Sequence, residues 1–318
     1  MGCIVTVSPL FMQNNSDTRN AYWQACFCLG LSMALVGCYV ALAKPLVSVF
    51  GVFALAWLRF VIGALAVPHW LRKPEQEPVL NLRMKGLLFL ESLLGNFLFS
   101  ICMLYGVSQT SAMAAGIILS MLPVVVAMLS VIVLRERLSG RLLLALVFAA
   151  TGMLLLNTAP RDGAARESQL WGNALVLAAV FCEAAYVVMG KRLSDVMTPR
   201  RITAVINLWG CALMTPLALW YWPAVNWSGV AASTWALLLF YGLAASVWSV
   251  WLWMTGLQQV KASQAGIFTV MLPVAASITG WVLGEAPDRW QGVAWLMAFL
   301  GVALASPRPE REKNNISE

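Results

Sequence analysis

The sequence predicts an all-α integral membrane protein with ten transmembrane helices, arranged as two inverted five-helix repeats. Three observations predict this fold: the composition, the distribution of basic residues and an internal duplication. Of the 318 residues, 60% are apolar and only 11% are charged, less than half the charged share of soluble globular domains. Because a helix needs about 20 mostly apolar residues to span a bilayer, the chain has material for many spans and only short connections.

The apolar residues form ten segments, separated by joints that contain Pro, Gly or charged residues. The segments are approximately residues 22–43, 48–67, 86–104, 112–134, 140–158, 170–190, 202–221, 233–254, 262–284 and 289–306. The chain then divides into a cytoplasmic N-terminal segment, a first repeat, an extracytoplasmic linker, a second repeat and a cytoplasmic tail. These parts are residues 1–21, 22–158, 159–169, 170–306 and 307–318.

The basic residues predict the orientation, because loops rich in Lys and Arg stay on the cytoplasmic face. With ten spans, sixteen of the 21 basic residues fall on one side and Arg59 falls within a span. The other side carries four, namely Lys44, Arg161, Arg166 and Arg289. We therefore expect a multi-pass protein of the cytoplasmic (inner) membrane with both termini in the cytoplasm. The net charge of +7 does not indicate nucleic-acid binding, because the basic residues lie between apolar runs.

The second half of the chain repeats part of the first. Shifting Gly106–Val124 by 150 residues onto Gly256–Val274 gives ten identities in nineteen positions, with two glycines and a proline among them. Each half contains five spans, an odd number, so the second copy enters the membrane from the opposite side. Inverted repeats are associated with alternating access, which makes transport the leading hypothesis.

Two segments carry a family resemblance, Ala112–Leu138 and Ala262–Pro287, each with small residues, a Leu-Pro pair and a Glu just past the helix. With its ten spans and its duplication, the chain resembles the EamA-type branch of the drug/metabolite transporter superfamily over about residues 22–306. The resemblance implies an exporter of amino acids, related metabolites or drugs in the cytoplasmic membrane. It also implies that the proton gradient drives this efflux.

Three charged residues lie inside predicted spans, where a charge costs about 3 kcal/mol on insertion scales. Arg59 and Glu183 are near the middle of their helices, and Glu91 is shallower. Arg59 is a candidate for binding a substrate carboxylate. Glu183 is a candidate proton acceptor or partner of a substrate ammonium group, and Glu91 a candidate for lining the inner vestibule. The alternative is structural: an Arg59–Glu183 ion pair, or Arg59 held by backbone carbonyls.

Other polar and aromatic side chains at depth complete the predicted substrate-binding and coupling set. They are Tyr39, Asn96, Tyr186, Asn207, Gln264, Trp248 and Trp251, with Ser246 as a further polar group. The alternative for each polar residue is a hydrogen bond that holds two helices together. Tyr186 follows Glu183 by three residues and therefore shares its helical face. The two tryptophans are candidate walls of a pocket for an apolar or cationic substrate, with packing as the alternative.

Pro123 and Pro273 occupy matching positions of the two repeats. Each removes a backbone donor within a predicted helix and so frees the carbonyl of Leu119 or Thr269, which gives a kink. We interpret them as hinges, and the alternative is a static bend accommodated by neighbouring helices.

Two glutamates follow the helices that contain these prolines. We expect Glu136 and Glu285 to be interfacial and structural, paired with Arg137 or Arg289. Because Glu285 is followed by Ala-Pro-Asp whereas Glu136 is followed by Arg-Leu, equivalent roles for the two acids are in doubt.

Neither a cofactor nor a metal is predicted, because the chain has one histidine, His69, and lacks HExxH and CxxC motifs. We therefore expect no enzymatic activity, although an intramembrane enzyme is the main rival class. A lipid-anchored scaffold is disfavoured by the short loops. The prediction is a secondary-active exporter by proton antiport, whose partners are a small-molecule substrate, protons and the bilayer. The alternative is a proton-independent uniporter or exchanger. The cargo and the oligomeric state, a monomer included, stay open.

Overall fold

A computed structural model describes residues 15–75, 77–109, 118–157, 166–225, 227–282 and 291–305. Every regular element in these ranges is a helix, as the composition predicts. The longer elements are α1 (Asn15–Ala41), α2 (Ala43–Ala66), α3 (Leu82–Ser92), α4 (Phe99–Gln109), α6 (Leu122–Leu134), α7 (Gly140–Asn157), α8 (Arg166–Ser194), α9 (Pro199–Tyr221), α10 (Ala232–Leu243), α11 (Ser249–Gln259), α12 (Ala262–Phe268), α13 (Met271–Val282) and α14 (Gln291–Ala305). The short elements are η1 (Pro68–Leu71), η2 (Leu93–Leu98), η3 (Trp222–Ala224), η4 (Trp227–Gly229) and η5 (Ala244–Trp248).

Seven helical segments of the described chain are long and apolar enough to cross a membrane. They are Asn20–Val40, Pro45–Ala66, Leu82–Met103, Leu170–Ser194, Pro199–Tyr221, Ala232–Gln259 and Ala262–Val282. Three shorter apolar helices, Leu122–Leu134, Gly140–Gly152 and Gly292–Ala305, lie near residues outside the described ranges. The count of ten spans therefore stays a prediction, whereas a multi-pass membrane fold is supported.

The boundaries of the predicted parts differ from the helices in two places. Helix α1 begins at Asn15, so residues 15–21 of the expected N-terminal segment are helical. Helix α8 begins at Arg166 and takes up the end of the expected linker. The rest of the linker and the expected C-terminal tail lie outside the described residues.

Two of the apolar segments contain π-helical turns at corresponding places. The π-helix η2 joins α3 to α4, and the π-helix η5 joins α10 to α11. Their first residues, Leu93 and Ala244, lie about the repeat spacing apart in the sequence. Because π-turns are rare and cluster at functional sites, these two segments are candidates for positioning a binding site.

The segments that contain Pro123 and Pro273 are interrupted by turns rather than kinked. A turn at residues 269–270 separates α12 from α13, and a turn at residues 120–121 precedes α6. Pro273 therefore lies in the first turn of α13, where a missing N–H costs little. The expectation that Pro273 frees the carbonyl of Thr269 is wrong, because that oxygen accepts a hydrogen bond from the Leu272 N–H at 3.1 Å. The hinge role of both prolines stays a prediction.

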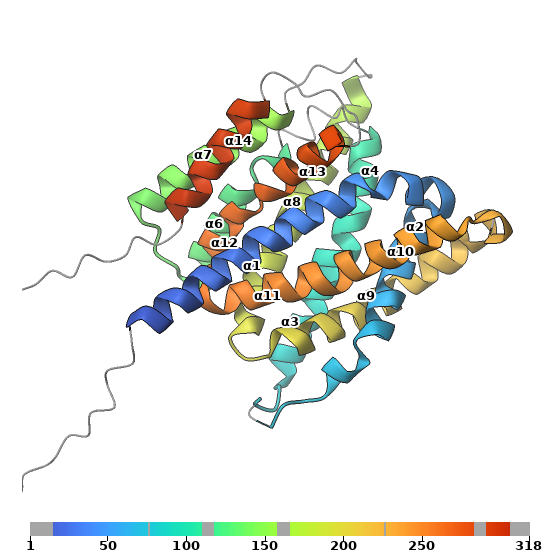
Figure 1. Cartoon of the computed structure of the whole chain (residues 1–318), viewed down its shortest axis with the longest axis horizontal. Helices are drawn as coiled ribbons and strands as arrows, with labels where there is room; N and C mark the ends of the chain where they lie inside the picture. The colour runs from blue at the N-terminus through green and yellow to red at the C-terminus, as the bar shows by residue number, and fades with distance from the viewer. Residues whose placement is uncertain are drawn as a thin grey trace, which may run out of the picture.

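Helices α7 and α14 pack side by side along one flank of the bundle (Figure 1). A side chain at Gly152 would meet the backbone of Ala298, and one at Gly301 would meet the backbone of Ala149. Gly152 and Gly301 are 149 residues apart in the sequence, as are Ala149 and Ala298. The same glycine–alanine contact therefore occurs twice, with the glycine on α7 in one case and on α14 in the other. The residue numbers rise along one helix where they fall along the other, so the two helices run antiparallel.

Helices α2 and α9 also make contacts that recur with the partners exchanged. A side chain at Gly63 would meet Asn207, and one at Gly210 would meet Phe60. Gly63 and Gly210 are 147 residues apart, as are Phe60 and Asn207. Contacts that exchange their partners in this way are those that an inverted repeat predicts.

A third pair of contacts follows the same rule between different helices. Gly256 of α11 lies against Leu29 of α1, and Gly106 of α4 lies against Val176 of α8. The helix pairs α1–α11 and α8–α4 are thus equivalent, although they lie in different parts of the chain. The main core takes its buried side chains chiefly from α1, α6, α8, α9, α11 and α12.

One end of the bundle, which we call the terminal end, gathers the start of α1, the start of α12 and the end of α14. The Tyr22 hydroxyl donates to the Gln264 side chain at 3.1 Å, and the Gln264 amide donates to the Ala305 carbonyl at 3.3 Å. Both ends of the described chain are therefore on the same side of the bundle.

Glu136, which follows α6, holds the start of α12 at the terminal end. Its carboxylate accepts hydrogen bonds from the Ala262 N–H at 2.9 Å, the Ser263 N–H at 3.0 Å and the Ser263 hydroxyl. The first N–H groups of a helix have no partner within the helix, so the carboxylate satisfies two of them. The expected pairing with Arg137 is not present in the described residues, whereas Glu285 lies outside them.

A second carboxylate, Glu77, does the same for α9. It lies in the connection between η1 and α3 and accepts from the Thr198 N–H at 3.2 Å and from the Arg201 guanidinium at 2.9 Å. Glu77 is almost completely buried. Two acidic residues of the first half therefore hold the starts of two helices of the second half.

The α7–α14 contact predicts matched losses of stability. Replacing Gly152 or Gly301 by Leu is expected to destabilise the protein by about 1–3 kcal/mol each, because the new side chain meets backbone atoms. The measurement is thermal unfolding in detergent. Gly86→Leu is the control, because a Cβ there meets nothing within 4 Å. A loss at only one of the two glycines would contradict the exchanged packing.

The contacts of Glu136 predict that Glu136→Ala destabilises the protein by about 1.5–3 kcal/mol, the range for a hydrogen bond to a charged group. Arg137→Ala is expected to have little effect, because Arg137 is exposed. Thermal unfolding of the two variants in the same detergent decides between the contacts. Equal losses would show that Glu136 acts through Arg137 after all.

Candidate functional site

Five polar side chains predicted to lie at membrane depth come together in the interior. This central cluster consists of Tyr39 of α1, Arg59 of α2, Glu91 of α3, and Glu183 and Tyr186 of α8. Tyr39 interacts electrostatically with Arg59 and Glu183, and Tyr186 interacts with all four other members. Residues far apart in the sequence thus form one polar group inside an apolar bundle.

Arg59 enters the cluster without an acidic partner. Its guanidinium carbon lies 4.3 Å from the centroid of the Phe60 ring, a cation–π contact. The ion pairs between described residues are Lys191–Asp195 and Arg201–Glu77. The structural alternative of an Arg59–Glu183 ion pair is therefore not observed, and both side chains are half-buried rather than sealed.

Tyr186 is positioned by a glycine in the facing π-helix. A Cβ atom at Gly95 would overlap the Tyr186 ring, so only glycine leaves room for the ring at this place. The neighbouring residue, Asn96, has a buried side-chain nitrogen that lacks a hydrogen-bond partner among the described residues. A buried donor without a partner requires an explanation, and a bound solute is one.

Asn207 and Gln264 make hydrogen bonds that join helices, and the buried Asn207 amide oxygen has no hydrogen-bond partner among the described residues. The Asn207 amide donates to the Thr203 carbonyl at 2.8 Å and to the Ser246 carbonyl at 2.7 Å, which links α9 to η5. Gln264 links α1, α12 and α14 at the terminal end through Tyr22 and Ala305. Their part in substrate binding stays a prediction, and the contacts favour the alternative.

The two tryptophans contact other aromatic rings. Trp248 is partly exposed and packs edge-on against Phe240 at 6.1 Å between ring centroids. Trp251 contacts Trp70 of η1 at 6.2 Å. Nothing in these contacts places them against Arg59 or Glu183, so the pocket-wall role stays a prediction.

Tyr241 was not selected from the sequence, yet it contacts the cluster. Its ring meets the Tyr39 ring edge-on, with centroids 5.4 Å apart and an angle of 86° between the planes. Tyr241 lies 150 residues after Glu91, so the two residues occupy equivalent positions of the sequence repeat. Applying that spacing to the charged residues at depth, and not only to the identical positions, is the signal that identifies it.

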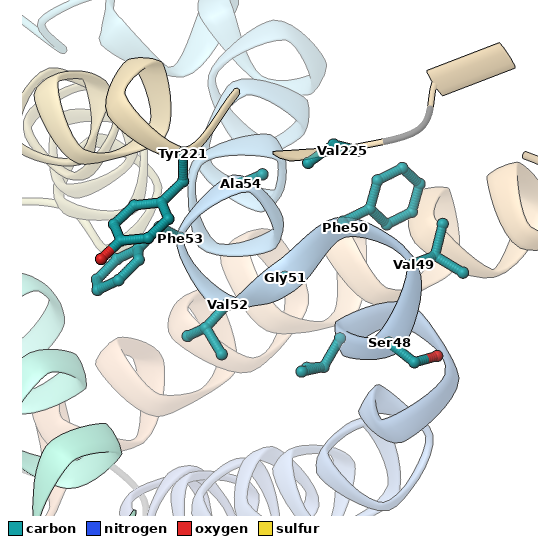
Figure 2. Close-up of a pocket in the computed structure, with 10 residues that line it drawn as sticks. Ser48, Val49, Phe50, Gly51, Val52, Phe53, Ala54, Tyr221 and Val225 are labelled. Carbon is teal, nitrogen blue, oxygen red and sulfur yellow. The ribbon is translucent and has the colours of Figure 1, made fainter. Parts of the chain in front are cut away.

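A cavity of about 390 Å³ lies in the part of α2 away from the terminal end. It is lined by residues 47–54, Tyr221 and Val225, and the Phe53 and Tyr221 rings stack beside it with centroids 4.9 Å apart (Figure 2). Gly51 interrupts the helix here with φ of +68°, a conformation that favours glycine. Gly51 precedes Arg59 by about two helical turns, so the cavity lies between the cluster and that end of the bundle.

The described residues contain no group of three or more His, Cys, Asp or Glu side chains that could hold a metal ion. The groups that keep accessible surface are one cation, Arg59, and one carboxyl group, Glu183, with phenol and amide groups beside them. Such a set can bind a small polar solute by charge and hydrogen bonds, whereas the Glu91 carboxyl group is sealed.

The model of the EamA-like transporter family matches this chain twice, at residues 23–158 and 170–306. The chain is 33% identical to the uncharacterized transporter YetK of Bacillus subtilis (strain 168) over 279 residues, covering 86% of this chain and 82% of YetK. It is 25% identical to the uncharacterized transporter YyaM of the same organism, covering 91% of this chain and 95% of YyaM.

A crystal structure with 17% sequence identity supports the same fold. It matches with a TM-score of 0.67 and covers 92% of this chain and 97% of the other. The curated relatives are named as transporters, which supports a membrane transporter role and gives no indication of an enzyme. The chain belongs to the EamA-like transporter family of the drug/metabolite transporter superfamily.

Proposed function

We propose that this protein is a secondary-active transporter that exports an amino acid or a related zwitterionic metabolite by proton antiport. The observation that carries the proposal is the presence of Arg59 and Glu183 in one interior cluster without an ion pair between them. A cation and a carboxylate that are both free to bind suit a solute with a carboxylate and an ammonium group. Both keep accessible surface at membrane depth, which binding requires.

In this proposal Arg59 binds the carboxylate of the solute, and Glu183 binds its ammonium group or a proton. The two ligands compete for Glu183 because a protonated carboxyl group no longer attracts a cation. Asn96 supplies a donor from the facing π-helix, and Tyr39 and Tyr186 flank the solute with their hydroxyl groups. Charge-assisted hydrogen bonds of this kind are stronger than those between neutral groups.

Alternating access follows if the two halves are inverted copies. The exchanged contacts of α7–α14 and α2–α9, and the equivalence of α1–α11 with α8–α4, support a two-fold relation between antiparallel halves. An inverted pair can exchange conformations, which opens the shared site to one side and then the other. Pro123 and Pro273, beside the two helix breaks, are the proposed hinges.

We assign the terminal end of the bundle to the cytoplasm. Arg141, Lys191, Arg192 and Arg201 make their contacts at this end, and basic residues favour the cytoplasmic face. The caps formed by Glu77 and Glu136 hold the two halves together there. A cavity of about 630 Å³ lies at the same end, beside the start of α1 and the end of α11.

Glu183→Gln is expected to abolish transport driven by a pH gradient, because the amide neither binds a proton nor attracts an ammonium group. The measurement is flux of radiolabelled neutral amino acids through the purified protein in sealed liposomes with and without a pH gradient. Glu75→Gln is the control, because Glu75 is exposed in a connection. Unchanged pH-driven flux in Glu183→Gln would count against the proposal, and wild-type flux that follows the solute gradient alone would favour uniport or exchange.

The proposed orientation predicts that both termini are cytoplasmic. Epitope tags at the N-terminus and at the C-terminus are expected to resist protease in intact cells whose cell wall has been removed, and to be cleaved in inverted membrane vesicles. Cleavage of one tag in each preparation would place the termini on opposite faces and exclude two five-span copies.

A further inference from the structure

Glu91 lies in α3 with its carboxyl group sealed inside the bundle. The side chain is fully buried, and neither carboxyl oxygen has a hydrogen-bond partner among the described residues. An ionised carboxylate in such a place has nothing to compensate the loss of water. A group of this kind requires an explanation, and the cargo site formed by Arg59 and Glu183 does not supply one.

The facing helix shows how the carboxyl group is sealed. A Cβ atom at Gly190 of α8 would lie 2.9 Å from Glu91 Oε1, so the absence of a side chain there makes room for the acid. One turn along each helix, Gly95 makes room for the Tyr186 ring in the same way. The acid and the ring therefore interlock α3–η2 with α8, and a shift of α8 along this contact uncovers both.

The charged groups around Glu91 are engaged elsewhere. Lys191, next to Gly190, donates to the Leu257 carbonyl at 2.7 Å and pairs with Asp195 at 3.0 Å. From α9, Arg201 pairs with Glu77, and the Arg200 guanidinium lies 5.9 Å from the Trp70 ring centroid. The sequence of α11, whose residues Met254 and Leu257 also approach Gly190, contains no titratable side chain.

Tyr186 is the titratable group of α8 that interacts with Glu91, and it interacts with Glu183 and Arg59 as well. Tyr186 therefore interacts both with the sealed Glu91 carboxyl group and with the charged groups of the cargo site. A change of charge at either carboxyl group is felt at the same phenol, which gives a physical connection between the two.

The other half of the protein shows that the acid is not needed for packing. In the sequence repeat Tyr39 is equivalent to Tyr186, 147 residues later, and Glu91 is equivalent to Tyr241, 150 residues later. In that half two tyrosine rings pack together, with centroids 5.4 Å apart. A phenol fills the equivalent position, so a carboxyl group in the first half alone needs a reason other than helix contact.

We propose that Glu91 is a second proton-binding site of the transport cycle, distinct from the cargo site at Arg59 and Glu183. In the arrangement described here Glu91 holds a proton on its carboxyl group. Movement of α8 away from Gly95 and Glu91 exposes the carboxyl group to water on one side of the membrane, which accepts the proton. The carboxylate takes up a proton from the other side before the contact with α8 closes again. This inference rests on the proposed function, because it assigns the group that makes the conformational change depend on protons.

The experiment separates proton coupling from cargo binding. The purified full-length protein is placed in sealed liposomes, and the probe is a mixture of radiolabelled neutral amino acids. One assay measures accumulation driven by a pH gradient, and the other measures exchange of labelled for unlabelled solute at equal pH. Glu91→Gln is expected to reduce accumulation to the level of protein-free liposomes while exchange continues. Glu183→Gln is expected to lose both, and Glu75→Gln to lose neither.

Two further measurements distinguish loss of the carboxyl group from a folding defect in the Glu91→Gln variant. Glu91→Asp retains a carboxyl group and is expected to restore part of the accumulation. An infrared pH titration of the wild-type protein without solute is expected to show a protonated carboxyl band that disappears in Glu91→Gln.

The outcomes distinguish this inference from the proposed function. If the wild type accumulates solute and Glu91→Gln does so equally, the role of Glu91 is wrong and antiport stands. If the wild type does not respond to a pH gradient, antiport is wrong and the role of Glu91 with it. Loss of exchange in Glu91→Gln, or an infrared band that is unchanged by the substitution, would also overturn the role of Glu91.

Discussion

Helices in a bilayer gain little by burying apolar side chains against each other, because lipid tails are equally apolar. The bundle therefore depends on close backbone approach at small residues, and α2, α4, α7, α9, α11 and α14 each have a glycine that lies against a neighbouring helix. The same requirement positions the polar groups. Gly95 receives the Tyr186 ring and Gly190 receives the Glu91 carboxyl group, so the geometry of the site follows from the packing of the helices that carry it.

The helical class and most of the apolar segments could be predicted because length and hydropathy are local properties of the sequence. The places where the helices are interrupted could not be predicted in this way. The turn at Thr269 and Val270, the π-turns of η2 and η5 and the left-handed Gly51 depend on what each helix packs against. The interruptions nevertheless recur at corresponding places of the sequence repeat. One pair is the turns before Pro123 and Pro273, and the other is the π-helices η2 and η5.

Part of the candidate site could be predicted because a charged residue within an apolar span indicates a functional position even when its spatial neighbours are unknown. That argument found Arg59 and Glu183, whereas the role of Asn207 depended on carbonyl groups of α9 and η5 that only the fold brings near. Glu136 was assigned to Arg137, its neighbour in the sequence. Its partners are instead backbone N–H groups at the start of α12, because these donors have no other partner in the helix.

The proposed two-fold relation between the halves has a consequence for the relative free energies of the transporter's states. If the halves exchange conformations, the two states of the scaffold are close in free energy, and small asymmetric terms decide which is populated. A ligand shifts such an equilibrium only by its difference in affinity for the two states. One asymmetry in the interior is the pair of Glu91 and Tyr241 at equivalent positions, a carboxyl group in one half and a phenol in the other. A proton on that carboxyl group favours the state that seals it against Gly190 and has no counterpart in the opposite half, so the equilibrium between the two states depends on protons.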